Sequence, residues 1–144
     1  MHWRPTDTIA GRLMRSDYGY CPSNIIGGVG EVGGSLNGVT IEQCSSVDGD
    51  FTRLADGTMI CNSNVIYADI KFVVGATFRS VIQTWTFPSG FIAPPIVLGG
   101  AASDVANLWV SAGQPTTSAS SAVAFAYVSA TGGSFQLTAS GRWF

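Results

Sequence analysis

Charged residues are scarce in this chain of 144 residues. Asp, Glu, Lys and Arg make up 11% of the sequence, against about 25% in ordinary soluble domains. The shortage is concentrated in positions 76–144, whose only charged residues are Arg79, Asp104 and Arg142. A monomer with so neutral a surface tends to self-associate. We therefore expect an obligate homo-oligomer that buries much of this surface between its copies. The alternative is a monomer with a neutral surface rich in Ser, Thr and Gly.

Other scarce features exclude further classes of function. The net charge is −2 and there is no basic run, which argues against nucleic-acid binding through phosphate contacts. No run of about 18 apolar residues is present, so we expect no membrane insertion. The three cysteines form no CxxC pair and the only histidine is His2; we therefore expect free thiols, no metal and no cofactor. The first twenty residues lack the apolar segment of a signal peptide, so we expect assembly in the cytoplasm.

Apolar residues make up 46% of the chain, enough for one buried core. After residue 50 they occur in short runs with a period of two, which is typical of antiparallel strands with one buried face. Asp56–Gly57 between two such runs predicts a hairpin. Apolar residues alternate along 65–74, which predicts a single strand there. ATGGS at 130–134 is predicted to be the turn before the last strand. Short strands at this spacing predict an all-β fold, a small antiparallel β-sandwich.

One strand carries alanine along an entire face. Ala122, Ala124 and Ala126 alternate with Val123, Phe125 and Tyr127. Such small side chains require a close neighbour, which is either another sheet or another subunit.

The first fifty residues differ in composition from the rest. They hold six of the nine acidic residues, and positions 27–38 are the glycine-rich GGVGEVGGSLNG. Such a stretch is flexible alone or packs its backbone closely against a partner. We therefore divide the chain into an attachment or linker segment at residues 1–50, extended and mostly irregular, and a β-sandwich at residues 51–144.

The stretch Thr84–Gly100, TWTFPSGFIAPPIVLGG, has three aromatic residues, three prolines and no charge. Proline is tolerated at the starts and edges of strands but not in central ones. Pro88 should therefore end one strand and Pro94–Pro95 should precede the next. Trp85 and Phe87 share a strand face, so we expect this stretch to enter the core of the sandwich.

Three segments of the chain together resemble the C-terminal tips of bacteriophage and prophage tail-fibre proteins. GDFTRLADGTMIC at 49–61 resembles the pattern G-x-[FY]-x-R-x-A-D-G-T-x-x-C, and the segment from Trp85 resembles W-x-F-P-x-x-F-x-x-x-P-x-V. The terminal ASGRWF resembles the ending A-x-G-R-W. The resemblance implies a homotrimeric fibre or spike tip in the virion of a phage, a prophage or a gene transfer agent. It also implies a β-sandwich similar to H-type lectin domains, and an N-terminal segment that attaches to another virion structural protein.

Some fibre tips bind iron through repeated His-x-His, and the single histidine here rules out that pattern. Glycans bind to aromatic ring faces flanked by hydrogen-bonding groups. Asp104, Asn107 and Trp109 lie within six residues of one another, and we predict that they and Tyr127 contact a glycan. The alternatives are a core position for Trp109 and Tyr127 and a turn cap for Asp104. For Arg142 we predict an inter-subunit or main-chain contact.

We expect no enzymatic activity and no catalytic residue. Glycan cleavage needs two carboxylates across a cleft, and the acids of the predicted sandwich share no motif. Asp48 and Asp50 resemble the start of a calcium loop, but the glutamate that ends such a loop is missing. The predicted function is a virion receptor-binding protein that adheres to a bacterial surface polysaccharide, either capsule or lipopolysaccharide. The alternatives are a purely structural trimerisation tip or plug and, more remotely, a glycan depolymerase.

Overall fold

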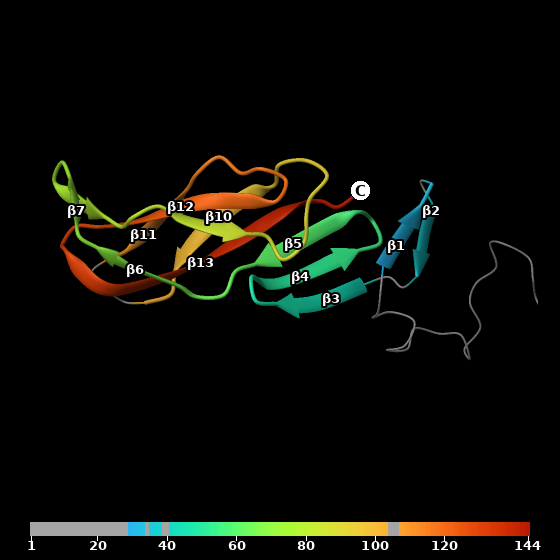
Figure 1. The fold of residues 1–144 in the computed structure, drawn as a ribbon, viewed down its shortest axis with the longest axis horizontal. Coiled ribbons are helices and arrows are strands. Elements are labelled where there is room, and N and C mark those ends of the chain that lie inside the picture. The colour runs from blue at the N-terminus through green and yellow to red at the C-terminus, as the bar shows by residue number, and fades with distance from the viewer. Residues whose placement is uncertain (1–28, 34, 39–40, 104–106) are drawn as a thin grey trace, which may run out of the picture.

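The computed structural model describes residues 29–33, 35–38, 41–103 and 107–144. These residues form thirteen β-strands and no helix (Figure 1). The strands build two antiparallel sheets that pack against each other, and a separate hairpin of β1 (Val29–Val32) and β2 (Ser35–Gly38). The predicted all-β class with two sandwich-like layers is therefore confirmed. The described residues include no helix long and apolar enough to cross a membrane.

The larger sheet is built around its longest strand, β13, and is called the β13 sheet below. β10 pairs along one side of β13, and β5 and β6 pair end to end along the other side. β4 and β3 extend the sheet beyond β5. Its strands are β3 (Ile41–Ser46), β4 (Gly49–Leu54), β5 (Thr58–Asn62), β6 (Ile66–Ile70), β10 (Ile96–Ala101) and β13 (Ala130–Arg142).

The second sheet, called the β12 sheet, repeats this plan. β11 pairs along one side of β12, and β9 and β8 pair end to end along the other side, with β7 beyond β8. Its strands are β7 (Phe72–Val74), β8 (Thr77–Arg79), β9 (Gln83–Thr86), β11 (Trp109–Ala112) and β12 (Ala119–Ala126). Each sheet thus has a break in its ladder where two short strands meet beside the central strand.

A buried serine fills the break in each sheet. Between β5 and β6, the Ser63 N–H donates to Leu137 O at 2.8 Å and the Ser63 hydroxyl accepts the Leu137 N–H at 2.9 Å. Between β8 and β9, Ser80 does the same for Ala124, at 2.8 and 3.1 Å. In both places a hydroxyl oxygen takes the position of a missing strand carbonyl, so the central strand keeps its hydrogen bonds.

The core lies between the two sheets and follows the predicted alternation. The alanine face of β12 points inward, so the close neighbour that it requires is the β13 sheet, which presents Phe135, Leu137 and Ala139. The proline-bounded stretch contributes its aromatic residues to the same core. The buried hydrophobic residues are Met59, Cys61, Ala68, Ile70, Trp85, Phe87, Phe91, Ala122, Ala124, Ala126, Phe135, Leu137 and Ala139.

Turn chemistry explains the strand ends. The Asp56–Gly57 hairpin is confirmed, with Gly57 at φ 91° and the Thr58 N–H donating to Asp56 Oδ1 at 2.8 Å. This hydrogen bond lowers the pKa of the Asp56 carboxyl from its usual 3.8. As predicted, β9 ends just before Pro88 and β10 begins directly after Pro94–Pro95.

Three predicted boundaries are wrong. The strand expected at 65–74 divides at Lys71 into β6 and β7, which belong to different sheets. The expected turn at 130–134 is the first part of β13, where the pairing with β6 shifts register at a bulge. The division at residue 50 falls inside β4, and residues 41–50 belong to the β13 sheet rather than to an irregular segment. Residues 1–28 of the predicted linker lie outside the described residues.

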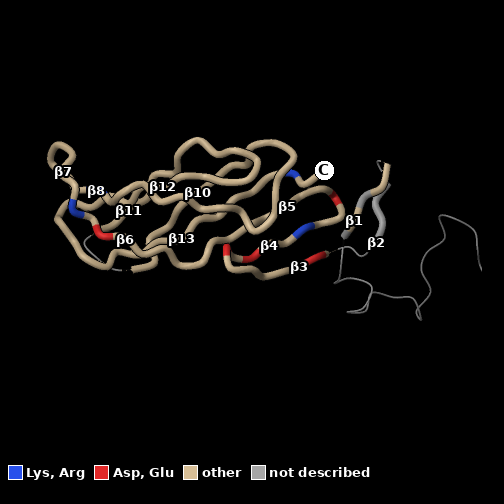
Figure 2. The backbone as a smooth tube through the Cα atoms, in the orientation of Figure 1, with Lys and Arg blue, Asp and Glu red and all other residues tan. Residues whose placement is uncertain are grey.

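Charged residues lie at the two ends of the sandwich and also at the start of β4, nearer its middle (Figure 2). β10, β11 and β12 carry none, and β13 carries only Arg142 at its last position. The two central strands, β12 and β13, and the strands β10 and β11 beside them are therefore neutral over nearly all of their length.

Candidate functional site

The outer face of the β12 sheet carries a row of large side chains across four strands. Trp109 on β11 is directly opposite Phe125 on β12, Phe125 is opposite Arg79 on β8, and Arg79 is opposite Phe72 on β7. Directly opposed residues of antiparallel strands point to the same face. These four residues, together with Tyr127 just after β12, are called the aromatic row below.

The rings of the row contact one another. Trp109 stacks on Phe125 with a centroid distance of 5.8 Å and an interplanar angle of 12°, and Tyr127 lies 5.2 Å from Trp109. Trp109 is 38% exposed and Tyr127 is 63% exposed. The alternative of a core position is therefore wrong for both residues in the single chain.

The alanine face of β12 explains why these rings are on the surface. Because the alanines face inward, the residues between them must face outward, and Phe125 is one of these. Contiguous exposed apolar surface is a common mark of a binding site. The row can offer flat ring faces to a ligand, with the Arg79 guanidinium as a hydrogen-bond donor beside them.

Only part of the predicted site can be placed. Trp109 and Tyr127 are brought together as adjacent rings. Asn107 lies two residues before Trp109 with a positive φ of 53°, a conformation that Asn tolerates better than most residues. Asp104 lies outside the described residues. Arg79 and Phe72 were not predicted as site residues, because only the strand register shows that they continue the row.

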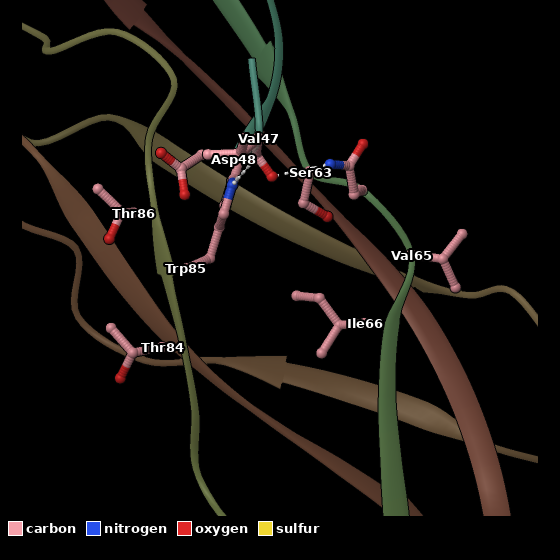
Figure 3. Close-up of a pocket in the computed structure, with 9 residues that line it drawn as sticks. Val47, Asp48, Ser63, Val65, Ile66, Thr84, Trp85 and Thr86 are labelled. Carbon is pink, nitrogen blue, oxygen red and sulfur yellow. Dashed lines mark hydrogen bonds between the residues drawn. The ribbon is translucent and has the colours of Figure 1, made fainter.

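A hollow between the two sheets is a second candidate (Figure 3). It has a volume of about 190 Å³, and Figure 3 shows Asp48 and Thr86 on one side of it and Val65 and Ile66 on the other. Two of its polar groups already have internal partners, since the Trp85 indole N–H donates to Asp48 O and the Asn64 amide donates to Val47 O. Its lining is Val47, Asp48, Ser63, Asn64, Val65, Ile66, Thr84, Trp85 and Thr86.

The three segments that carry the tail-fibre resemblance meet around one side chain. The Arg53 guanidinium lies 5.1 Å from the Phe51 ring and 5.3 Å from the Trp143 ring, and it donates to Ser89 Oγ at 2.5 Å. Arg53 comes from the first segment, Ser89 from the second and Trp143 from the third. The Trp143 indole N–H also donates to Leu54 O at 3.0 Å.

Arg142 belongs to the same end of the molecule. Its guanidinium lies over the Gly57 turn, where a Cβ would come within 2.6 Å of it, and 5.7 Å from the Phe144 ring. The backbone carbonyl of Arg142 accepts the Ile92 N–H at 2.9 Å. The inter-subunit contact predicted for Arg142 stays a prediction.

Two of the acidic residues expected in the sandwich, Asp56 and Asp69, lie among the described residues. Asp56 and Asp69 lie near opposite ends of the fold, and the hydrogen bond from Lys71 lowers the pKa of Asp69. A general acid in glycan cleavage needs the opposite shift. Among the described residues, no three of His, Cys, Asp and Glu gather as a metal site would require.

The fold resembles that of pyocin tail fibres. An N-truncated R1-type pyocin tail fibre matches with a TM-score of 0.52 and 11% sequence identity, over 72% of this chain and 87% of that chain. A C-terminal fragment of the P. aeruginosa R1 pyocin fibre matches with a TM-score of 0.54 and 13% identity, over 98% of this chain and 41% of the fragment. No protein-family model and no curated protein sequence matches. The expected similarity to phage-like tail-fibre C-terminal domains is thus confirmed at the level of the fold.

Proposed function

We propose that this chain is a receptor-binding domain of a phage-like tail fibre, and that its aromatic row binds a bacterial surface glycan. The observation that carries the proposal is the group of contacting, exposed rings at Trp109, Phe125 and Tyr127. Sugar rings present a C–H face that packs on such rings, while their hydroxyls bond to flanking polar groups. The fold shared with pyocin tail fibres supports the setting in a virion or tail-like particle.

The active form in this proposal is a homotrimer that buries the outer face of the β13 sheet. On that face Ile96 is 73% exposed and Leu98 is 69% exposed. Their cross-strand partners on β13 are Ser140 and Thr138, which are small and uncharged. The part of this face formed by β10 and β13 is neutral there, so it can meet a copy of itself without like-charge repulsion. The N-terminal segment would then join the trimer to another virion protein.

Adhesion to cells with and without surface polysaccharide tests the glycan claim. Trp109→Ala should weaken binding about tenfold per site, since an aromatic contact contributes about 1.4 kcal/mol. Three sites on a trimer amplify this loss through avidity. Ile92→Ala is the control, because Ile92 is a large hydrophobic residue that is 64% exposed but belongs neither to the aromatic row nor to a strand of the β13 sheet. Equal binding to stripped and intact cells would refute the glycan claim, and binding to neither would favour a structural role as a tip or plug.

Light scattering tests the assembly. The purified protein should have the mass of three chains at micromolar concentration, and Leu98→Asp should shift it toward the monomer. A stable wild-type monomer would refute the trimer. Release of reducing sugar ends from the bound polysaccharide would instead indicate a depolymerase.

A further inference from the structure

We propose that the glycan bound at the aromatic row is acidic, and that Arg79 binds its carboxylate or phosphate group. This inference rests on the proposed glycan-binding function and adds the chemical class of the ligand. The observations that carry it are the position of Arg79 within the row and the absence of an anionic partner for it among the described residues.

The strand register places Arg79 between aromatic residues. It is opposite Phe125 on one side and Phe72 on the other, and its side chain is half-buried. Neighbouring strands lie about 4.8 Å apart, so Arg79 is one strand spacing from Phe125 and about two from Trp109. A sugar ring that packs on either ring therefore has its substituents within reach of the guanidinium.

Arg79 is the only charged residue in the five strands of the β12 sheet. No hydrogen bond or ion pair joins its guanidinium to any residue that the structure describes. The other basic residue at this end differs, since Lys71 Nζ lies 2.7 Å from Asp69 Oδ2. Arg53, at the far end, bonds Ser89 and packs on two rings.

A half-buried guanidinium has lost part of its hydration and gains most from an anionic partner. Its planar fork of five N–H donors fits a carboxylate or a phosphate in a bidentate geometry. Uronic acids, other sugar acids and phosphorylated sugars supply both the ring for the aromatic residues and the anion for Arg79. A neutral glycan that covered the row would offer Arg79 hydroxyl acceptors but no anionic partner.

The experiment uses an array of purified bacterial capsular polysaccharides and lipopolysaccharides of known structure, probed with the full-length protein. We expect every bound glycan to carry an acidic group. Carboxyl reduction of a bound glycan should abolish binding if the group is a carboxylate, and hydrogen fluoride dephosphorylation should do so if it is a phosphate. Higher salt should weaken binding, because the contact is partly exposed.

Variants assign the effect to Arg79. Arg79→Gln should weaken binding to the acidic glycan about tenfold to hundredfold, as expected for a charged hydrogen bond. Arg79→Lys should weaken binding less, because it keeps the positive charge. Lys71→Gln is the matched control and should have little effect, since its ammonium already has a carboxylate partner. Melting curves and light scattering check that each variant keeps its fold and assembly. The glycan modifications test the need for an acidic group with the wild-type protein, so their result remains valid even where a variant misfolds.

The outcomes separate this inference from the proposed function. Binding to neutral glycans, or binding that Trp109→Ala weakens and Arg79→Gln leaves unchanged, overturns the acidic ligand and keeps the glycan-binding face. Binding to no glycan on the array, with cell adhesion that does not depend on polysaccharide, overturns both.

Discussion

Removing the hydroxyl of Ser80 should destabilise the fold measurably. Ser80 is fully buried, and its hydroxyl accepts the Ala124 N–H at 3.1 Å while it donates to Val81 O at 2.7 Å. Ser80→Ala leaves the Ala124 N–H without a partner in the centre of the β12 sheet. Ser80 and Ala124 are both 0% exposed, so the amide is left without an acceptor in a buried place.

The expected cost follows from the state of the amide left behind. A buried donor left without an acceptor lowers the free energy of unfolding by about 1–3 kcal/mol. The loss is smaller where the remaining partner can bond to water instead. A domain of this size has a total stability of about 5–15 kcal/mol, so the change is a large fraction of it. Ser63→Ala in the β13 sheet should cost a similar amount, because its hydroxyl accepts the Leu137 N–H in the same way. The two sites lie in different sheets, so their effects should add.

Urea unfolding followed by tryptophan fluorescence, at fixed protein concentration, measures the effect. Ser120→Ala is the control: Ser120 is 3% exposed, but its hydroxyl donates to two carbonyls at 3.2 and 3.4 Å and accepts no backbone N–H. If Ser80→Ala and Ser63→Ala lower the free energy of unfolding no more than Ser120→Ala does, the prediction is refuted. The serine hydroxyls would then not be needed to complete the hydrogen bonding of the two central strands.

Two further predictions concern backbone geometry and thiol chemistry. Gly49→Ala should lower the free energy of unfolding by clearly more than the roughly 1–2 kcal/mol of a strained φ alone. The reason is that φ is 127° and a Cβ there would also collide with the Asn62 carbonyl oxygen. Gly75→Ala, at φ 61° in open space, gives the cost of strain alone for comparison in urea unfolding. Iodoacetamide at pH 8 should modify the exposed Cys44 in the native protein and spare Cys61, since burial raises the pKa of the Cys61 thiol to about 11. Peptide mass spectrometry reads both sites, and equal modification would contradict the buried position of Cys61.

Much of the sandwich follows from local patterns in the sequence. The alternation in β12 and β13 predicts which side chains share a face, because an extended strand turns successive side chains to opposite faces. Asp56–Gly57 predicts its hairpin, and Pro88 and Pro94–Pro95 predict strand ends, because these residues restrict the backbone directly.

Features that depend on pairing between distant strands do not follow in the same way. The alternation from Ile66 to Val74 continues across Lys71, so no local signal marks the point where the chain crosses between sheets. The aromatic row has the same origin, because Phe72, Arg79, Phe125 and Trp109 become neighbours only through the register of four strands. The sequence also left open a core position for Tyr127, which shares its face with Val123 and Phe125. The second sheet lies close to the alanines, and the larger residues face outward.

The segments that resemble tail-fibre tips and the residues proposed to bind a glycan have separate tasks. Around Arg53 the three segments contact one another, so their residue types are explained by packing within the chain. Gly141, for example, has no room for a side chain, because a Cβ there would come within 2.9 Å of Phe91 Cδ1. The aromatic row contains no residue from these segments, and its rings contact one another on the surface. A sequence pattern built on the Arg53 contacts therefore identifies the fold, and the ligand must be sought among residues that the pattern leaves free to vary.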